Sequence, residues 1–213
     1  MIRDRGGGPV SMRVAKLVQI PAEEVLRRDD PRWGRLHDIV FERSFQTGNF
    51  ILASGVSSKF LFQLRQTTML AEGAALIAEI VLEYMQRHGI HCIGGLVQGA
   101  VPIGQSVLML GHAKQYPIHH FFVRKEAKKH GALELIDGYP QDDSEVLIVD
   151  DVATKGGSIK TAIEKLLKEH PSCVVKRALV VIDRQEGAAE TLLAKRNVHL
   201  VSLFKKSDFP IPA

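Results

Sequence analysis

Residues 146–158 read VLIVDDVATKGGS, an apolar stretch followed by two acidic residues and then a loop of small and hydroxyl-bearing residues. The apolar part predicts a strand, and the loop opens the next predicted helix. Backbone N–H groups and hydroxyls at the positive end of a helix dipole form a cradle for phosphate. Asp150 and Asp151 would repel a phosphate that they touched, but they can accept hydrogen bonds from nearby sugar hydroxyls. The run therefore predicts a site for a phosphorylated ribose.

A second interpretation of this run stays open. In an ordinary strand–turn–helix connection, Asp150 or Asp151 would act as an acidic N-cap and satisfy the first amides of the helix. The run is not a Walker loop, because the GxxxxGK[ST] spacing is absent. The residues alone are compatible with both interpretations.

Apolar runs alternate with helical periodicity along most of the chain, which is typical of an α/β fold with a parallel sheet covered on both faces. We expect helices at about 31–44, 70–88, 102–110, 158–168 and 188–195, and strands at about 90–97, 118–123, 146–149, 174–182 and 198–204. A strand-like stretch at 50–64 turns at Ser54 and Gly55. One domain is expected over 31–213, with a cap at 31–66, a core at 67–213 and a loose N-terminal extension at 1–30. Ligands of such sheets bind at the carboxyl ends of the strands.

The composition excludes several classes of protein. The 213 residues are 45% hydrophobic and carry a formal net charge of +4, which is ordinary for a globular domain. Aromatic residues make up only 6%, which argues against a base-stacking nucleic-acid surface. Residues 90–113 carry no charged side chain, but their glycines, proline and glutamines argue against a membrane span. No signal peptide is recognisable, and Cys92 and Cys173 show no metal-ligand spacing. We expect a cytoplasmic protein without a nucleic-acid or membrane partner.

The run at 146–158 resembles the phosphoribosyl pyrophosphate signature of the type I phosphoribosyltransferases. Three further segments, in the expected order, resemble the orotate phosphoribosyltransferase family: FILASG at 50–55, RKEAKKHG at 124–131 and DRQEG at 183–187. The similarity spans about residues 41–204. It implies an α/β fold with a Rossmann-like parallel-sheet core, a small N-terminal hood and a flexible catalytic loop. Two positions depart from the family pattern: Ala53, where many relatives carry a lysine, and Lys155, where a small residue is common.

The resemblance implies transfer of ribose 5-phosphate from phosphoribosyl pyrophosphate to orotate, which gives orotidine 5′-monophosphate and pyrophosphate. Lys128 is the implied catalytic residue. The implied donor-binding residues are Arg124, Lys125, Lys128, His130, Asp150, Asp151, Val152, Ala153, Thr154, Lys155, Gly156, Gly157 and Ser158. The implied orotate-binding residues are Leu61, Phe62, Thr154 and Arg184. An arginine suits orotate because its guanidinium fork matches a carboxylate in two parallel hydrogen bonds.

The family further implies a magnesium ion and a second subunit. Mg²⁺ would be held mainly through pyrophosphate oxygens and water, and we name no protein ligand for it. The implied homodimer shares its active sites, because the loop at 124–131 reaches into the neighbouring subunit's site.

Simpler explanations accompany these roles. The segment at 124–131 could be a solvated charged loop, and Arg184 could be a surface residue paired with Asp183 or Glu186. Residues 95–102 resemble the family's pyrophosphate loop but could be only a tight strand-to-helix turn. The alternative functions are a phosphoribosyltransferase for another nucleobase and a regulator of the same fold that senses phosphoribosyl pyrophosphate.

Overall fold

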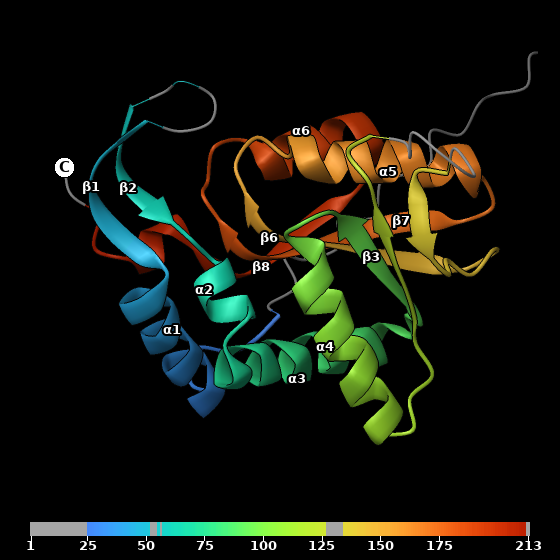
Figure 1. Ribbon diagram of the computed structural model, residues 1–213, viewed down its shortest axis with the longest axis horizontal. Coiled ribbons are helices and arrows are strands. Elements are labelled where there is room, and N and C mark those ends of the chain that lie inside the picture. The colour runs from blue at the N-terminus through green and yellow to red at the C-terminus, as the bar shows by residue number, and fades with distance from the viewer. Residues whose placement is uncertain (1–24, 52–54, 56, 127–133, 212–213) are drawn as a thin grey trace, which may run out of the picture.

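The computed structural model describes residues 25–51, 55, 57–126 and 134–211. A six-stranded sheet lies at its centre, with helices on both faces (Figure 1). The strands of this sheet are β3 (Cys92–Leu96), β4 (His119–Val123), β5 (Ile136–Gly138), β6 (Glu145–Ala153), β7 (Val174–Asp183) and β8 (His199–Lys205). The helices are α1 (Pro31–Arg43), α2 (Arg65–Thr68), α3 (Ala71–His88), α4 (Ala100–Ala113), α5 (Gly157–Glu169) and α6 (Ala188–Arg196). No helix among the described residues has the length and apolar character of a membrane span.

The order across the sheet is β5-β4-β3-β6-β7-β8. All neighbouring strands are parallel except β4 and β5, which confirms the expected parallel α/β core. β3 is the first of these strands along the chain and lies between β4 and β6. From β3 the chain adds β4 and β5 on one side and then returns to add β6, β7 and β8 on the other side. Such a reversal is a topological switch point, where ligand crevices form at the carboxyl ends of the strands.

Apolar packing covers both faces of the sheet. On one face, Ile77 of α3 belongs to the same buried cluster as Leu147 of β6. On the other face, Ile163 of α5 belongs to a second cluster with Ile148, the next residue of the strand. Successive side chains of a strand point to opposite faces, so a continuous apolar run serves both clusters.

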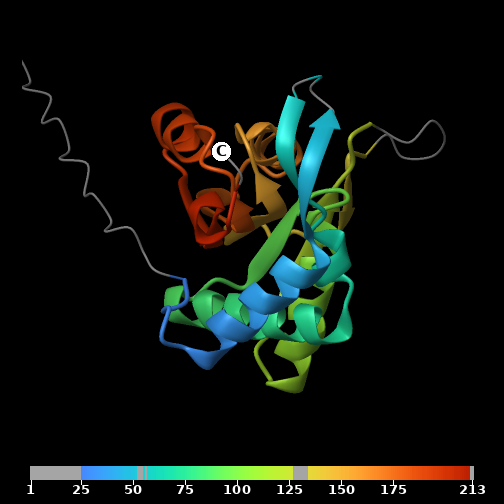
Figure 2. The same ribbon diagram turned by 90° about the vertical axis from the view of Figure 1, so that its left-hand side faces the viewer.

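An antiparallel pair, β1 (Phe45–Ile51) and β2 (Ser57–Phe62), forms the expected small hood. Figure 2 shows these strands side by side, projecting from the end of α1. Phe45 and Phe62 are register partners, and both contact the ring of Phe209, which follows β8 and a short 3-10 helix (Lys206–Asp208). These aromatic contacts join the hood to the last strand of the sheet.

The structure corrects several expected boundaries. β6 continues past the predicted 146–149 as far as Ala153, because it keeps pairing with β7. β1 begins at Phe45, before the predicted strand-like stretch, and the three-residue β5 is too short for its pattern to predict it. Val25 and Leu26 are buried in the core. The folded domain therefore includes residues 25–30, which the sequence assigns to a loose extension.

Candidate functional site

The pairing of β3 with β6 at the switch point stops before the carboxyl ends of the two strands. Their register ends with Gly94 opposite Ile148, although β6 continues beyond that position. The loop after β3 then approaches β6 closely. A Cβ atom on Gly99 would lie 2.0 Å from Oδ1 of Asp150 and 2.7 Å from Oδ1 of Asp151. Only glycine permits this approach, so the loop backbone lies directly against the acidic pair.

The acidic pair is held by the backbone of its own strand. The N–H of Asp151 donates to Oδ1 of Asp150 at 3.0 Å, and the N–H of Val152 donates to Oδ1 of Asp151 at 2.9 Å. Asp150 is only 6% exposed. Burial raises the pKa of Asp150 well above its usual range, and the adjacent charge of Asp151 raises it further. The fold therefore holds a carboxyl group where its charge is unfavourable until a partner arrives.

The loop after β6 leads to the open N-terminus of α5. Gly156 occupies the N-cap position with φ of 77°, a conformation that favours glycine. No side chain among the described residues caps α5, so the interpretation of Asp150 or Asp151 as a helix cap is wrong. Thr154, Lys155, Gly157 and Ser158 are exposed. Uncapped amides at the positive end of the helix dipole, next to two hydroxyls, are suited to bind a phosphate.

Arg184 lies at the same edge of the sheet, directly after β7. Its N–H donates to the carbonyl oxygen of Ala153 at 2.9 Å, which ties it to the end of β6. The residue is 6% exposed and its guanidinium lies 4.6 Å from the ring centre of Phe60 in the hood. Nε lies 2.9 Å from Oε1 of Glu186, but among the described residues it has no hydrogen bond of acceptable geometry. Arg184 is thus paired with Glu186 as one alternative expects, yet it is buried and not a surface residue.

The segment that resembles the catalytic loop connects β4 to β5. The guanidinium of Arg124 is paired with Asp137 of β5, and Lys125 is exposed. Lys125 is close enough to Asp150 for its charge to oppose the rise in the pKa of that carboxyl. Lys128 and His130 lie outside the described residues, so their predicted roles stay predictions.

Helix α5 holds both stems of this connection. Nζ of Lys165 donates to the carbonyl oxygens of Arg124 at 2.9 Å and Lys125 at 2.6 Å. Oε1 of Glu169, one helical turn further along, accepts from the N–H of Leu135 at 3.0 Å. The helix that presents open amides at its N-terminus therefore also fixes the base of the predicted loop.

The loop after β3, which resembles the pyrophosphate loop, has a partner in α2. Nη1 of Arg65 donates to Oε1 of Gln98 at 2.7 Å. The peptide bond between Val97 and Gln98 is cis, and Gly99 follows against the acidic pair. The loop is thus a strand-to-helix turn whose backbone lies against the acidic pair.

The hood places the two aromatic positions of β2 on one face. Phe60 contacts Arg184, whereas Phe62 is buried among hood aromatics beside Phe209. Leu61 alternates to the opposite face and is half-buried. Ala53 lies outside the described residues.

Three residues at the site were not singled out by the sequence: Phe60, Gly99 in its contact with the acidic pair, and Arg65. Phe60 directly precedes Leu61 and Phe62, the implied orotate-binding positions, and Gly99 lies within residues 95–102, which resemble the pyrophosphate loop. Arg65 carries no local signal, since its contact to Gln98 joins residues far apart in sequence.

Comparisons with known proteins agree with this geometry. The family model of the phosphoribosyl transferase domain matches residues 64–201. An orotate phosphoribosyltransferase of Rhodopseudomonas palustris (strain BisB5) is 41% identical over 179 residues, which covers 82% of this chain and 94% of that relative. Two crystal structures of the Mycobacterium tuberculosis H37Rv orotate phosphoribosyltransferase are also similar.

The complex with Fe(III) dicitrate has a TM-score of 0.72 at 31% identity and covers 84% of this chain and 98% of that one. The complex with 5-phospho-alpha-D-ribosyl 1-diphosphate has a TM-score of 0.69 at 27% identity and covers 88% and 96%. With the sheet order, the acidic pair and the open α5 terminus already in place, these similarities show that the chain belongs to the orotate phosphoribosyltransferase family of phosphoribosyltransferases.

Proposed function

We propose that this chain transfers the ribose 5-phosphate group of phosphoribosyl pyrophosphate to orotate, releasing orotidine 5′-monophosphate and pyrophosphate in the synthesis of pyrimidine nucleotides. The observation that carries the proposal is the arrangement at the carboxyl edge of the sheet. Buried Asp150 and half-buried Asp151 precede a helix N-terminus that no described side chain caps. Directly after the neighbouring strand, Arg184 is buried, with its Nε paired with Glu186 but without a well-formed hydrogen bond to any described residue.

Each part of the substrates has a chemically matched position in this arrangement. The 5-phosphate would bind the amides of residues 154–158 and the hydroxyls of Thr154 and Ser158. The ribose hydroxyls would donate to Asp150 and Asp151. The carboxylate of orotate would take both arms of the Arg184 guanidinium, with Thr154 and Phe62 as the proposed neighbours of the base. Leu61 is left out, because it lies on the face of β2 opposite to Phe60, the residue that contacts Arg184.

The reaction needs positive charge at the leaving group. As the bond to pyrophosphate breaks, the anomeric carbon becomes oxocarbenium-like and negative charge develops on the departing group. We propose that Lys128 meets this charge as the catalytic residue, assisted by Arg124, Lys125 and His130. The closed loop would also exclude water from the reacting carbon.

We propose that a magnesium ion arrives with the sugar donor. Among the described residues, no group of three or more His, Cys, Asp or Glu side chains is suited to a metal. Mg²⁺ usually keeps several water and phosphate ligands, so the ion would be held mainly through pyrophosphate oxygens and water, and we assign it no protein ligand. When bound, the ion would neutralise charge on the pyrophosphate.

We further propose a cytoplasmic homodimer in which the loop of one subunit completes the active site of the other. The free, buried Cys92 and Cys173 fit a reducing compartment. Mixing an Lys128→Ala variant with an Arg184→Ala variant tests the shared site. If the sites are shared, a hybrid dimer has one intact active site, so the mixture should recover activity. A hybrid dimer that is shown to form and is still inactive would contradict a shared site.

The reaction itself is tested by following the ultraviolet absorbance of orotate. Orotate should be consumed only when both phosphoribosyl pyrophosphate and Mg²⁺ are present. Uracil, adenine and xanthine serve as competitors. If one of them is consumed and orotate is not, that nucleobase is the substrate. Binding of the sugar donor without turnover of any base would favour the regulator.

A further inference from the structure

The loop after β3 lacks the charge that a polyanionic ligand needs. Residues 90–113 contain no Asp, Glu, Lys or Arg. At Gly99 the loop lies against Asp150 and Asp151, two groups that repel a phosphate. A pyrophosphate group bound at this loop therefore needs a cation from another part of the fold.

Arg65 is a cation that the structure places on this loop. Its Nη1 donates to Oε1 of Gln98 at 2.7 Å, and Gln98 directly precedes Gly99. The side chain is exposed, and this bond uses one of the five N–H donors of the guanidinium. Within the described part of the chain this is the guanidinium's one hydrogen bond, so its remaining donors can bind an anion beside the loop.

The backbone that carries Arg65 is firmly anchored. Leu64, its preceding neighbour, is 1% exposed. Thr67, two residues later, is buried, and its hydroxyl lies 2.7 Å from the hydroxyl of Ser44 at the end of α1. The base of the side chain is therefore fixed between two buried contacts, while its charged head remains exposed. A fixed base reduces the conformational entropy lost when the head binds an anion.

We infer that Arg65 binds the pyrophosphate group of the sugar donor and that Gln98 orients its guanidinium for this contact. The inference rests on the proposed function for the identity of the ligand. It adds to the active site a cation from α2, separate from the segment at 124–131. The competing explanation is that the Arg65–Gln98 bond only ties α2 to the loop.

The test compares Arg65→Gln with a matched surface variant, Arg35→Gln. Arg35 is exposed on α1 and is paired with Glu72. In Arg65→Gln, the KM for phosphoribosyl pyrophosphate and the inhibition constant of pyrophosphate should each rise about tenfold, the usual scale for loss of one charge-assisted hydrogen bond. The KM for orotate and the thermal midpoint should stay unchanged. Arg65→Lys should recover part of the loss, and Arg35→Gln should match the parent chain in every constant.

A structural tie alone predicts a different pattern. If Arg65→Gln lowers the thermal midpoint and changes the KM of both substrates equally, or if it behaves like Arg35→Gln, the inference is overturned. Calorimetric titration with pyrophosphate in the absence of a nucleobase tests Arg65 independently of whether the chain turns over orotate. A chain that does not turn over orotate but binds pyrophosphate about tenfold more tightly than Arg65→Gln supports Arg65 as an anion-binding residue. Equal binding by the two proteins refutes it.

Discussion

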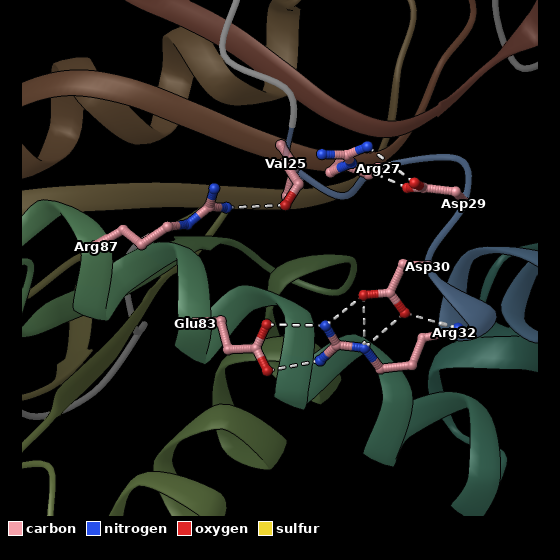
Figure 3. Close-up of polar contacts among 7 residues, drawn as sticks. All are labelled: Val25, Arg27, Asp29, Asp30, Arg32, Glu83 and Arg87. Atoms are coloured by element: carbon pink, nitrogen blue, oxygen red, sulfur yellow. Dashed lines mark hydrogen bonds and ion pairs between the residues drawn. The ribbon is translucent and has the colours of Figure 1, made fainter.

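Two charged regions of this molecule are organised in opposite ways. On the flank between α1 and α3, Arg32 bridges Asp30 at 2.7 Å and Glu83 at 2.6 Å, and Arg87 donates to the carbonyl oxygen of Val25 at 2.9 Å (Figure 3). The guanidinium of Arg32 holds the pKa of Asp30 below its usual range. A hollow of about 540 Å³ lies here as well. Its charges are already paired, so this hollow has little to offer a charged ligand.

The carboxyl edge of the sheet shows the reverse. Burial raises the pKa of Asp150, Nε of Arg184 is buried without a well-formed hydrogen bond to any described residue, and α5 has no side-chain cap among them. Each of these arrangements costs stability in the unliganded chain. The comparison teaches that a buried carboxyl with a raised pKa beside an open helix N-terminus, more than the size of a hollow, distinguishes the proposed functional region of this fold.

Replacement of the buried acid should give the largest change. Asp150→Asn removes a charged acceptor from the proposed ribose site, so kcat/KM should fall by about 100-fold or more. The same change should stabilise the chain, because the ionised form of this carboxyl is unfavourable where it is buried. Steady-state kinetics and denaturant unfolding measure both effects. Loss of activity together with loss of stability would mean that Asp150 is only structural.

The pH dependence of this stabilisation follows from the direction of the pKa shift. Between the ordinary carboxyl pKa near 4 and its raised value in the fold, the folded chain retains a proton on Asp150 that the unfolded chain has lost. This group's contribution to stability is therefore present at low pH and is lost as the pH rises through that window. The advantage of Asp150→Asn should grow over the same range, and a difference independent of pH would contradict the assignment.

Arg184→Ala should raise the KM for orotate by about 30- to 100-fold, because two charge-assisted hydrogen bonds to one carboxylate are lost. The KM for the sugar donor should change little. Arg184→Lys keeps the positive charge but loses the guanidinium fork, so its KM for orotate should lie between those of the parent chain and Arg184→Ala. An unchanged KM for orotate would remove Arg184 from the base site.

Gly99→Ala should have an intermediate effect. Its Cβ would lie 2.0 Å from a carboxylate oxygen that burial prevents from moving away. We expect a loss of about 1–3 kcal/mol in stability and about tenfold in kcat/KM. Gly34→Ala in α1 is the control, because a Cβ there meets no atom within 4 Å and alanine favours the helix. Equal behaviour of the two variants would show that the loop after β3 packs less tightly against the acidic pair than its contacts indicate.

Glu83→Gln on the flank should have the smallest effect. Its side chain is 48% exposed, so loss of the pair with Arg32 should cost about 0.5 kcal/mol or less. Activity should stay at the parent level. If activity falls as in the Gly99→Ala variant, the two regions are coupled and the contrast between them fails.

The sequence predicts the elements whose signals are local. Apolar periodicity and the left-handed Gly89 define the end of α3, and the run at 146–158 marks the acidic pair and the loop that follows. The extension of β6 through Asp150 depends on its pairing with β7, which lies beyond the reach of a local pattern. Similarly, four of the seven residues of β1 are consecutive exposed positions, so no alternation reveals its start at Phe45.

The remaining site features depend on how distant segments meet. Nothing in the chain near Phe60 indicates that its ring packs on Arg184, because this contact requires the hood to dock on the sheet edge. The pairing of Arg124 with Asp137 likewise requires the β4–β5 register. Resemblance can supply the residue types of a site, but tertiary packing decides which of them are buried and which are already paired.

The hydrogen bonds from Lys165 and Glu169 to the two ends of the β4–β5 connection have a consequence for protein engineering. An α-helix turns about 100° with each residue. One amino acid inserted into α5 between Gly157 and Lys165 would rotate both gripping side chains away from the stems while leaving the first turn intact. A chimaera that takes the segment between β4 and β5 from a relative should therefore take α5 from the same relative.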